Sequence, residues 1–196
     1  MQCYVIALQN NPRSQALLTD CLASCKRWAW SAEPYWAVVG ADLVPTHFQD
    51  LNLYLNPQTK IARRPGAQGC FLSHWNLWHL CVQKNTPIVI LESDAVIQGA
   101  MPVYTPAQGI QKFHTDRGTK TGFTGTWSKG AHAYAIAPAH AQALIQGIGS
   151  TEVKPADKCI GTRFVSWQHH SSDLVTLNPR RGPSTTARLW TLIQCR

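Results

Sequence analysis

The sequence predicts an α/β protein with a mostly parallel central sheet, and three observations support this. Short apolar runs typical of buried strands alternate with segments whose apolar residues recur every three to four positions. Hydrophobic residues make up 44% of the 196 residues, enough for a sizeable core. No internal repeat and no long linker interrupts the chain, so a single domain over residues 1–196 is expected.

The first part of the chain predicts a strand, a helix and a second strand. Residues 4–8 form an apolar run, and residues 14–28 carry apolar side chains at helical spacing. Residues 37–40 predict a short strand that ends at a glycine. Residues 41–65 show little periodicity, so a loop-rich stretch is expected there.

The clearest helix covers residues 66–83 and precedes a buried strand. Trp75 and Trp78 lie on its apolar stripe, where we expect them to pack in the core rather than against a sugar. A break at residues 85–87 is followed by the apolar run 88–91, which ends in Glu92-Ser93-Asp94.

The second half of the chain has weaker patterns. Residues 99–121 are polar and broken by prolines, so no element is predicted in them. Residues 131–137 predict a strand, and residues 138–147 a short helix with proline in its first turn. A loop is expected over residues 151–157, strand-like residues over 163–175 and an apolar run over 189–193.

The net charge of +8 is unevenly distributed along the chain. Residues 1–98 hold 7 Lys or Arg against 6 Asp or Glu, whereas residues 99–196 hold 11 against 4. Such a basic half suits an anionic ligand: a nucleotide diphosphate, an acidic glycan or nucleic acid. A basic solvated surface without a ligand is the alternative.

Membrane and secretory segments are not predicted. The apolar run 87–91 is far shorter than the ~20 residues of a membrane-spanning helix, and residues 3–8 are too few for a signal-peptide core. The seven cysteines form no CxxC pair, and Cys21 and Cys25 have no second pair at zinc spacing. Reduced, mostly buried thiols and a cytoplasmic location are therefore expected.

The acidic triplet is the sharpest local signal for chemistry. On an extended segment Glu92 and Asp94 would point the same way, at the carboxyl end of a sheet strand where α/β proteins bind ligands. Two carboxylates suit Mg²⁺ or Mn²⁺, whose coordination a nucleotide diphosphate would complete. Taken alone, the triplet also fits a solvated turn.

Residues 65–78 and 88–95 together resemble the signature of the family 25 glycosyltransferases. That signature has the pattern G-x-x-G-C-x-x-S-H, an aromatic-rich helix, and an apolar strand ending in E-D-D. The residues in register are Gly66, Gly69, Cys70, Ser73, His74 and Trp78. Weaker similarity extends over residues 6–8 with Arg13, residues 125–136, residues 154–157, and residues 174–175 with Ser184.

The resemblance implies a GT-A-like (Rossmann-related) nucleotide-sugar-binding domain that uses Mn²⁺ or Mg²⁺. The implied reaction is transfer of a hexose, galactose foremost, from a UDP-sugar to a glycan or other hydroxyl acceptor with inversion, as in lipopolysaccharide biosynthesis. Asp94 and Glu92 would hold the metal. The residues expected to bind the donor are Leu8, Arg13, Gly69, Ser73, Glu92, Ser93 and Asp94.

Two features depart from the family pattern. Ser93 replaces the middle aspartate of E-D-D, which removes one negative charge from the expected metal site. The segment between the triplet and Gly125 is shorter than is usual in the family, which affects the acceptor side.

Asp157 is the candidate general base or acceptor-binding residue, with a helix N-cap as the alternative role. Other possible bases are Asp116, Glu152, Asp173 and a histidine such as His169. His74 is expected to donate a hydrogen bond to the diphosphate or to orient Asp94, unless it merely packs in the core.

Further candidates are less specific. Arg180, Arg181 and Arg188 would meet the diphosphate or an acidic acceptor, and Trp127 and Trp167 would stack on a sugar. Two other functions stay open: a glycosyltransferase acting on nucleic acid bases, and a non-catalytic module that binds a sugar nucleotide or a glycan.

Overall fold

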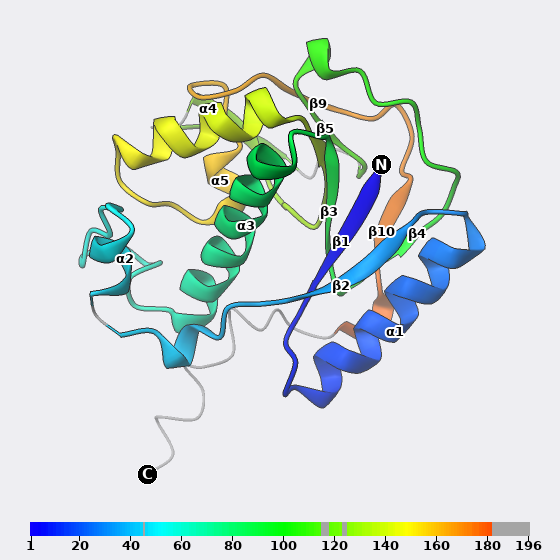
Figure 1. The fold of residues 1–196 in the computed structure, drawn as a ribbon, viewed down its shortest axis with the longest axis horizontal. Helices are drawn as coiled ribbons and strands as arrows, with labels where there is room; N and C mark the ends of the chain where they lie inside the picture. Colours follow the sequence, from blue (N-terminus) through cyan, green and yellow to red (C-terminus); the bar gives the residue numbers. More distant parts are fainter. Residues whose placement is uncertain (45, 115–117, 123–124, 182–196) are drawn as a thin grey trace.

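A six-stranded sheet in the order β2–β1–β3–β8–β5–β9 forms the centre of the protein. The computed structural model describes residues 1–44, 46–114, 118–122 and 125–181 (Figure 1). The β1/β2, β1/β3 and β5/β9 pairs are parallel, and β8 is antiparallel to both of its neighbours. This confirms the predicted α/β class with a mostly parallel central sheet. The strands are β1 (Gln2–Ala7), β2 (Ala32–Trp36), β3 (Ile88–Glu92), β5 (Ile110–Lys112), β8 (Ala133–Ile136) and β9 (Trp167–His169).

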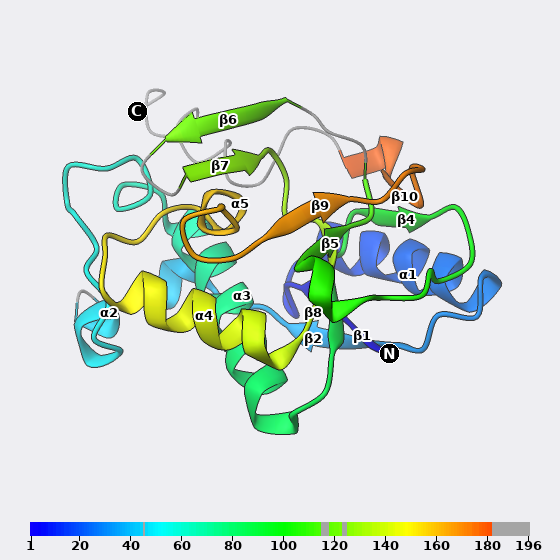
Figure 2. The same cartoon turned by 90° about the horizontal axis from the view of Figure 1, so that it is seen from above.

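Helices cover both faces of this sheet (Figures 1 and 2). Helix α1 (Pro12–Arg27) lies on one face, and α3 (Pro65–Lys84) and α4 (Pro138–Gly149) lie on the other. A cluster of buried apolar side chains lies on each face of the sheet. Successive side chains of β1 point to opposite faces, and Val5 belongs to the cluster that contains Leu18 of α1. The next residue, Ile6, belongs to the cluster that contains Trp78 of α3.

Smaller elements complete the structure. Strands β4 (Ala95–Ile97) and β10 (Val175–Leu177) pair with each other, as do β6 (Thr119–Gly122) and β7 (Gly125–Ser128). The short helices are η1 (Gly40–Asp42), α2 (His47–Asp50), η2 (Pro106–Gln108), α5 (Ala156–Cys159) and η3 (Pro179–Arg181). No helix in the described part of the chain is long and apolar enough to cross a membrane.

Local signals explain where the long helices begin and end. The Asn11 side chain accepts a hydrogen bond from the Ser14 backbone N–H at 2.9 Å, which caps the start of α1. Pro65 occupies the first turn of α3, where its missing N–H costs no helical bond. The helix ends at Asn85, which adopts a left-handed conformation with φ of 49°.

The second strand lies earlier than the sequence predicts. The apolar residues 37–40 follow β2 rather than form it. Strand β2 is at the edge of the sheet and its residues Glu33, Pro34 and Trp36 are exposed, so it lacks the apolar pattern of a buried strand. An edge position also tolerates the proline.

Several short elements appear where none was predicted, among them β5 and α5. Strand β5 lies inside the polar stretch 99–121 and is fully covered, although it includes Lys112. The expected loop at residues 151–157 contains the beginning of α5. Both elements are only three or four residues long, too short for a recognisable period. The apolar run at 189–193 is outside the described residues.

The connections of β1 create a switch point in the sheet. Helix α1 links β1 to β2 across one face, whereas α3 precedes β3 on the other face, and β2 and β3 flank β1 on opposite sides. In open α/β sheets, ligands bind outside the carboxyl ends of strands at such a point. Residues 6–8, 37–41 and 92–94 meet there.

Candidate active site

A cavity of about 870 Å³ opens at the carboxyl ends of β1, β2 and β3. This volume is in the usual range for a small-molecule site. The cavity gathers residues from several separate parts of the chain. The sequence-predicted residues that line it are Leu8, Arg13, Ser73, His74, Glu92, Ser93, Asp94 and Asp157.

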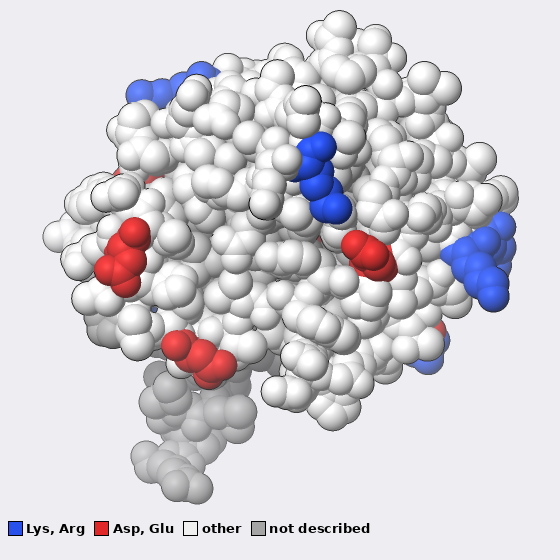
Figure 3. Space-filling view, viewed as in Figure 1, with Lys and Arg blue, Asp and Glu red and all other residues white. Residues whose placement is uncertain are grey.

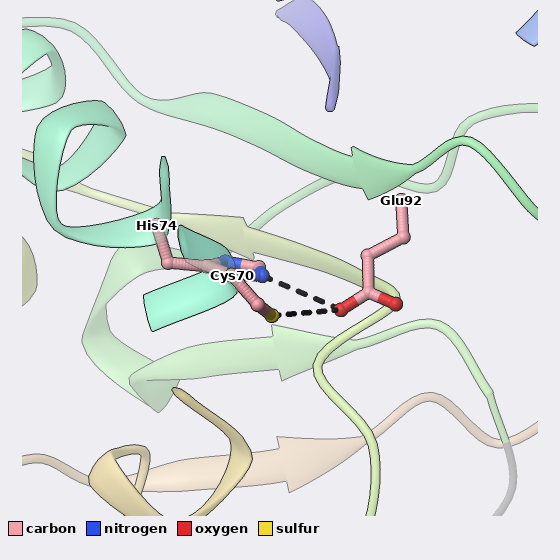
Figure 4. A group of neighbouring side chains, drawn as sticks. All are labelled: Cys70, His74 and Glu92. Carbon is pink, nitrogen blue, oxygen red and sulfur yellow. Dashed lines mark hydrogen bonds and ion pairs between the residues drawn. The ribbon is translucent and has the colours of Figure 1, made fainter. Parts of the chain in front are cut away.

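Cys70, His74 and Glu92 meet on the wall of this cavity (Figure 4). Cys70 and His74 lie one turn apart on α3, and Glu92 is the last residue of β3. The Oε1 of Glu92 lies 3.4 Å from Nε2 of His74 and 3.9 Å from Sγ of Cys70. The His74 side chain is completely buried, whereas that of Glu92 is 34% exposed. Glu92 is thus the member of the trio that is open to the cavity.

Hydrogen bonds from the core fix the orientation of His74. Trp78 donates its Nε1–H to the Tyr134 hydroxyl oxygen at 2.9 Å, because an indole N–H can only donate. The Tyr134 hydroxyl then donates to Nδ1 of His74, also at 2.9 Å. A neutral imidazole that accepts at Nδ1 carries its proton on Nε2, facing Glu92. His74 therefore acts as a positioned donor to Glu92.

Ser73 has a structural role at the cavity edge. Its hydroxyl oxygen accepts a hydrogen bond from the Val38 backbone N–H at 2.9 Å and donates to the Gly69 carbonyl at 2.7 Å. The side chain is fully buried. Ser73 thus fastens the segment after β2 to α3, and this segment forms one wall of the cavity.

Gly69 does not line the cavity, in contrast to the donor-binding role expected from the sequence. A Cβ at this position would lie 2.4 Å from the Val38 carbonyl oxygen and 2.8 Å from the Gly40 nitrogen. The glycine is therefore needed for the close approach of α3 to the segment after β2.

The acidic triplet does not continue as an extended strand. Strand β3 ends at Glu92, and Ser93 and Asp94 form a turn before β4. The Ser93 N–H donates to the Ile6 carbonyl at 3.0 Å, and the Asp94 carbonyl accepts from the Asn178 N–H at 2.7 Å. These bonds fix the turn. Glu92 and Asp94 therefore line the same cavity because of the turn, and not because they alternate along an extended strand.

Asp157 also lines the cavity, from the first turn of α5. The N-cap of this helix is Pro155, so the alternative interpretation of Asp157 as the N-cap is wrong. Its Oδ2 accepts a hydrogen bond from the Gly130 N–H at 3.4 Å. Burial raises the pKa of this carboxyl, while the Gly130 hydrogen bond and the charge of Lys112 lower it.

The buried Lys112 holds the segment that contacts Asp157. Its Nζ donates to the Ser128 carbonyl at 3.1 Å, to the Ser128 hydroxyl at 2.9 Å and to the Gly130 carbonyl at 3.3 Å. Three oxygens thus receive the three protons of a fully buried ammonium group. No pattern in the sequence predicts a buried lysine in a strand of the central sheet.

Four basic side chains share the cavity with the three carboxylates. Arg13 was expected there, whereas Lys60, Arg64 and Lys129 were not. They come from segments without regular periodicity, so only the folded chain shows that they converge. A cavity with both charges can take a diphosphate together with a cation.

Several candidates lie elsewhere. Arg180 pairs with Asp20 at 2.7 Å, and Glu152 pairs with Lys154 at 2.8 Å. Trp127 lies beneath the ammonium group of Lys158, and Trp167 donates to the Thr126 carbonyl. The described residues that do not line the cavity include Trp127, Glu152, Trp167, His169, Asp173 and Arg180. The side chain of Arg181 is not among those described. Asp116, Ser184 and Arg188 are outside the described residues.

The residues present fit a hard divalent cation at Glu92 and Asp94. Both carboxylates line the cavity, and Mg²⁺ commonly binds through one or two carboxylates plus substrate phosphates. Cys70 was not expected as a ligand. Its spacing of four residues from His74 on a helix is the signal that would have identified it.

Comparisons with known proteins agree with the resemblance found in the sequence. The family model for glycosyltransferase family 25 (LPS biosynthesis protein) matches residues 48–108, which include α3, β3 and the acidic triplet. No curated protein matches the chain. One similar solved structure is the galactosyltransferase LgtC in complex with donor and acceptor sugar analogs. It is 11% identical, with a TM-score of 0.46 over 86% of this chain and 73% of that chain.

Proposed function

We propose that this chain, which carries a family 25 glycosyltransferase segment at residues 48–108, transfers a hexose from a UDP-sugar to a glycan hydroxyl. Galactose is the foremost donor sugar, and the reaction uses Mn²⁺ or Mg²⁺. The family match supports glycosyl transfer. The donor, the metal and the acceptor are the parts of the proposal that need experiment.

One observation carries the proposal: a single cavity collects the predicted donor, metal and base residues from distant parts of the sequence. Leu8 follows β1 and Arg13 lies in the first turn of α1. Glu92 ends β3, Asp94 lies in the turn after it, and Asp157 belongs to α5. The place of this cavity at the switch point of the sheet agrees with nucleotide binding.

The charges of the cavity suggest how a donor would bind. Arg13, Lys60, Arg64 and Lys129 provide positive charge for a diphosphate. Glu92 and Asp94 would hold a divalent cation, which neutralises charge on the leaving diphosphate when it is bound. His74 keeps the Glu92 carboxylate in place through Nε2.

In the proposed transfer Asp157 acts as the general base. Its carboxylate takes the proton of the acceptor hydroxyl while that oxygen forms a bond to the anomeric carbon. The bond from the anomeric carbon to the diphosphate oxygen breaks, and UDP leaves with the electron pair. Attack on the face opposite the diphosphate inverts the anomeric configuration.

Other features support the setting of this reaction. The six described cysteines are free thiols, which agrees with the proposed location in the reducing cytoplasm.

On the face shown in Figure 3, Lys and Arg side chains of the described residues stand apart and form no continuous basic surface. We favour a glycan of the kind found in lipopolysaccharide as the acceptor, in line with the description of the matching family. We treat residues 1–196 as one glycosyltransferase domain.

A panel of nucleotide sugars, each with and without Mn²⁺, tests the proposal. Metal-dependent thermal stabilisation should be largest for a UDP-hexose, and UDP should be released when a glycan acceptor is added. Glu33→Gln, at an exposed position outside the cavity, is a control for nonspecific charge effects. Binding of a UDP-sugar without any UDP release would instead indicate the non-catalytic module.

A further inference from the structure

The geometry points to a second kind of metal site in the cavity, in which Cys70 Sγ, His74 Nε2 and Glu92 Oε1 bind a borderline transition-metal ion such as Zn²⁺ or Co²⁺. Among the described residues, this is the one trio of possible Cys, His, Asp or Glu ligand atoms that all lie within 4.8 Å of one another. It shares Glu92 with the hard-ion site proposed at Glu92 and Asp94 but takes its other ligands from α3, and it does not depend on the proposed function.

Two of the ligand separations in the trio are close to those of tetrahedral coordination. With ordinary zinc bond lengths, two tetrahedral ligands lie about 3.4 Å apart for nitrogen and oxygen and about 3.6 Å apart for sulfur and oxygen. The observed separations are 3.4 Å from His74 to Glu92 and 3.9 Å from Cys70 to Glu92. The first separation is long for a hydrogen bond to a carboxylate, for which about 2.8 Å is typical.

The ligand chemistry selects the class of metal. A thiolate and an imidazole favour Zn²⁺ or Co²⁺ over Mg²⁺ and Mn²⁺, which prefer oxygen ligands. Three protein ligands and one open position are also the arrangement of many catalytic zinc sites. Here all three residues line the cavity, so an ion could enter from it and take its fourth ligand from it.

The electrostatic environment favours a cation at this position. Burial raises the pKa of the Cys70 thiol well above its ordinary value, and the charges of Glu92, Asp157 and Asp94 raise it further. The same negative charges attract a divalent ion, and a coordinated thiol loses its proton to solvent. A bound divalent ion would therefore stabilise the Cys70 thiolate, which burial and the nearby carboxylates otherwise disfavour.

Binding has one identifiable cost. Nε2 of His74 must lose its proton to solvent to bind the metal, and Nδ1 takes a proton from solvent instead, so the ring stays neutral and Nδ1 donates to the Tyr134 oxygen. Tyr134 then accepts from both His74 and Trp78, and its own hydroxyl proton loses its acceptor. Such a loss weakens the affinity for the metal by about ten- to a hundredfold. Structural zinc sites bind tightly enough to tolerate a decrease of this size.

Co²⁺ alone, added to the metal-stripped full chain, provides the test. One equivalent should produce a thiolate-to-cobalt charge-transfer band together with tetrahedral ligand-field bands, and one equivalent of Zn²⁺ should abolish both. Cys70→Ser should remove the charge-transfer band. Cys81→Ser, which changes a buried thiol on the same helix, should keep it, as should Asp94→Asn.

Glu92→Gln gives a second, milder variant, expected to weaken Co²⁺ affinity at least tenfold while the circular dichroism spectrum is unchanged. The inference is wrong if wild-type protein shows no charge-transfer band with Co²⁺. It is also wrong if the band persists in folded Cys70→Ser or if Glu92→Gln binds Co²⁺ as tightly as wild type. The readout needs no sugar donor, so failure here would leave the proposed transferase activity standing.

Discussion

The Tyr134 hydroxyl lies 2.9 Å from Nδ1 of His74, and the two rings stack with centroids 5.8 Å apart. Trp78 donates to the same hydroxyl, and a tyrosine proton directed at Nδ1 of His74 would leave the imidazole proton on Nε2, which faces Glu92. A residue in the middle of β8 thus controls the protonation pattern at the cavity wall. Burial raises the pKa of Tyr134 well above its ordinary value, so the phenol stays protonated.

Tyr134→Phe should therefore destabilise the protein and allow the proton of His74 to move from Nε2 to Nδ1. It leaves the buried Trp78 N–H without its acceptor, which costs about 1–3 kcal/mol in the free energy of unfolding. Urea denaturation measures this cost, and ¹⁵N NMR of the imidazole reports the tautomer. Tyr54→Phe, at a side chain that is 61% exposed, should change neither. An unchanged Nε2–H tautomer in Tyr134→Phe would show that the hydroxyl does not set it.

Asp94→Asn should abolish Mn²⁺-dependent UDP binding and leave the fold intact. An amide cannot supply the negative charge that a hard divalent cation requires. Calorimetric titration of UDP with and without Mn²⁺ measures the effect, with Glu33→Gln as the exposed control. Equal UDP affinity in Asp94→Asn and wild type in the presence of Mn²⁺ would remove Asp94 from the metal site.

Asp157→Asn should retain metal-dependent donor binding but lose about 10²- to 10⁴-fold in transfer rate, the usual effect of removing a general base. A single-turnover assay separates the two properties. If turnover stays near normal, Asp157 is not the base. Asp116, which lies outside the described residues, becomes the next candidate, because Asp173 and His169 do not line the cavity.

The pH dependence has a definite sign because burial raises the pKa of Asp157. In wild type the transfer rate should fall on acidification at a higher pH than for an ordinary aspartate, as the base becomes protonated. A raised pKa in the folded state also means that this group's stabilising contribution is lost as pH rises through that pKa. At pH 7 Asp157→Asn should therefore match or exceed the wild-type melting temperature; a clear decrease would indicate a structural carboxylate.

Gly69→Ala should destabilise the protein by about 1–3 kcal/mol because its Cβ would collide with backbone atoms that cannot move freely. The affected segment forms a cavity wall, so donor affinity should fall as well. Gly149→Ala is the matched control at the end of α4, since a Cβ there meets nothing within 4 Å. Equal stability of the two variants in urea denaturation would rule out the close approach of α3 to this segment.

The sequence by itself determined the elements with long or strongly apolar patterns. Apolar residues at helical spacing predicted α3 and α4, and runs of buried apolar residues predicted β3 and β8. The spacing between His74 and the acidic triplet likewise pointed to the residues that meet at the cavity.

Only the tertiary structure decided what depends on contacts between distant segments. It placed Lys112 in a buried three-residue strand and turned Gly69 from a donor contact into a packing residue. It also brought Cys70 to Glu92 across 22 positions of sequence. Hydrogen-bond partners and close backbone approaches are set by the register of packed elements, which no local pattern of side chains encodes.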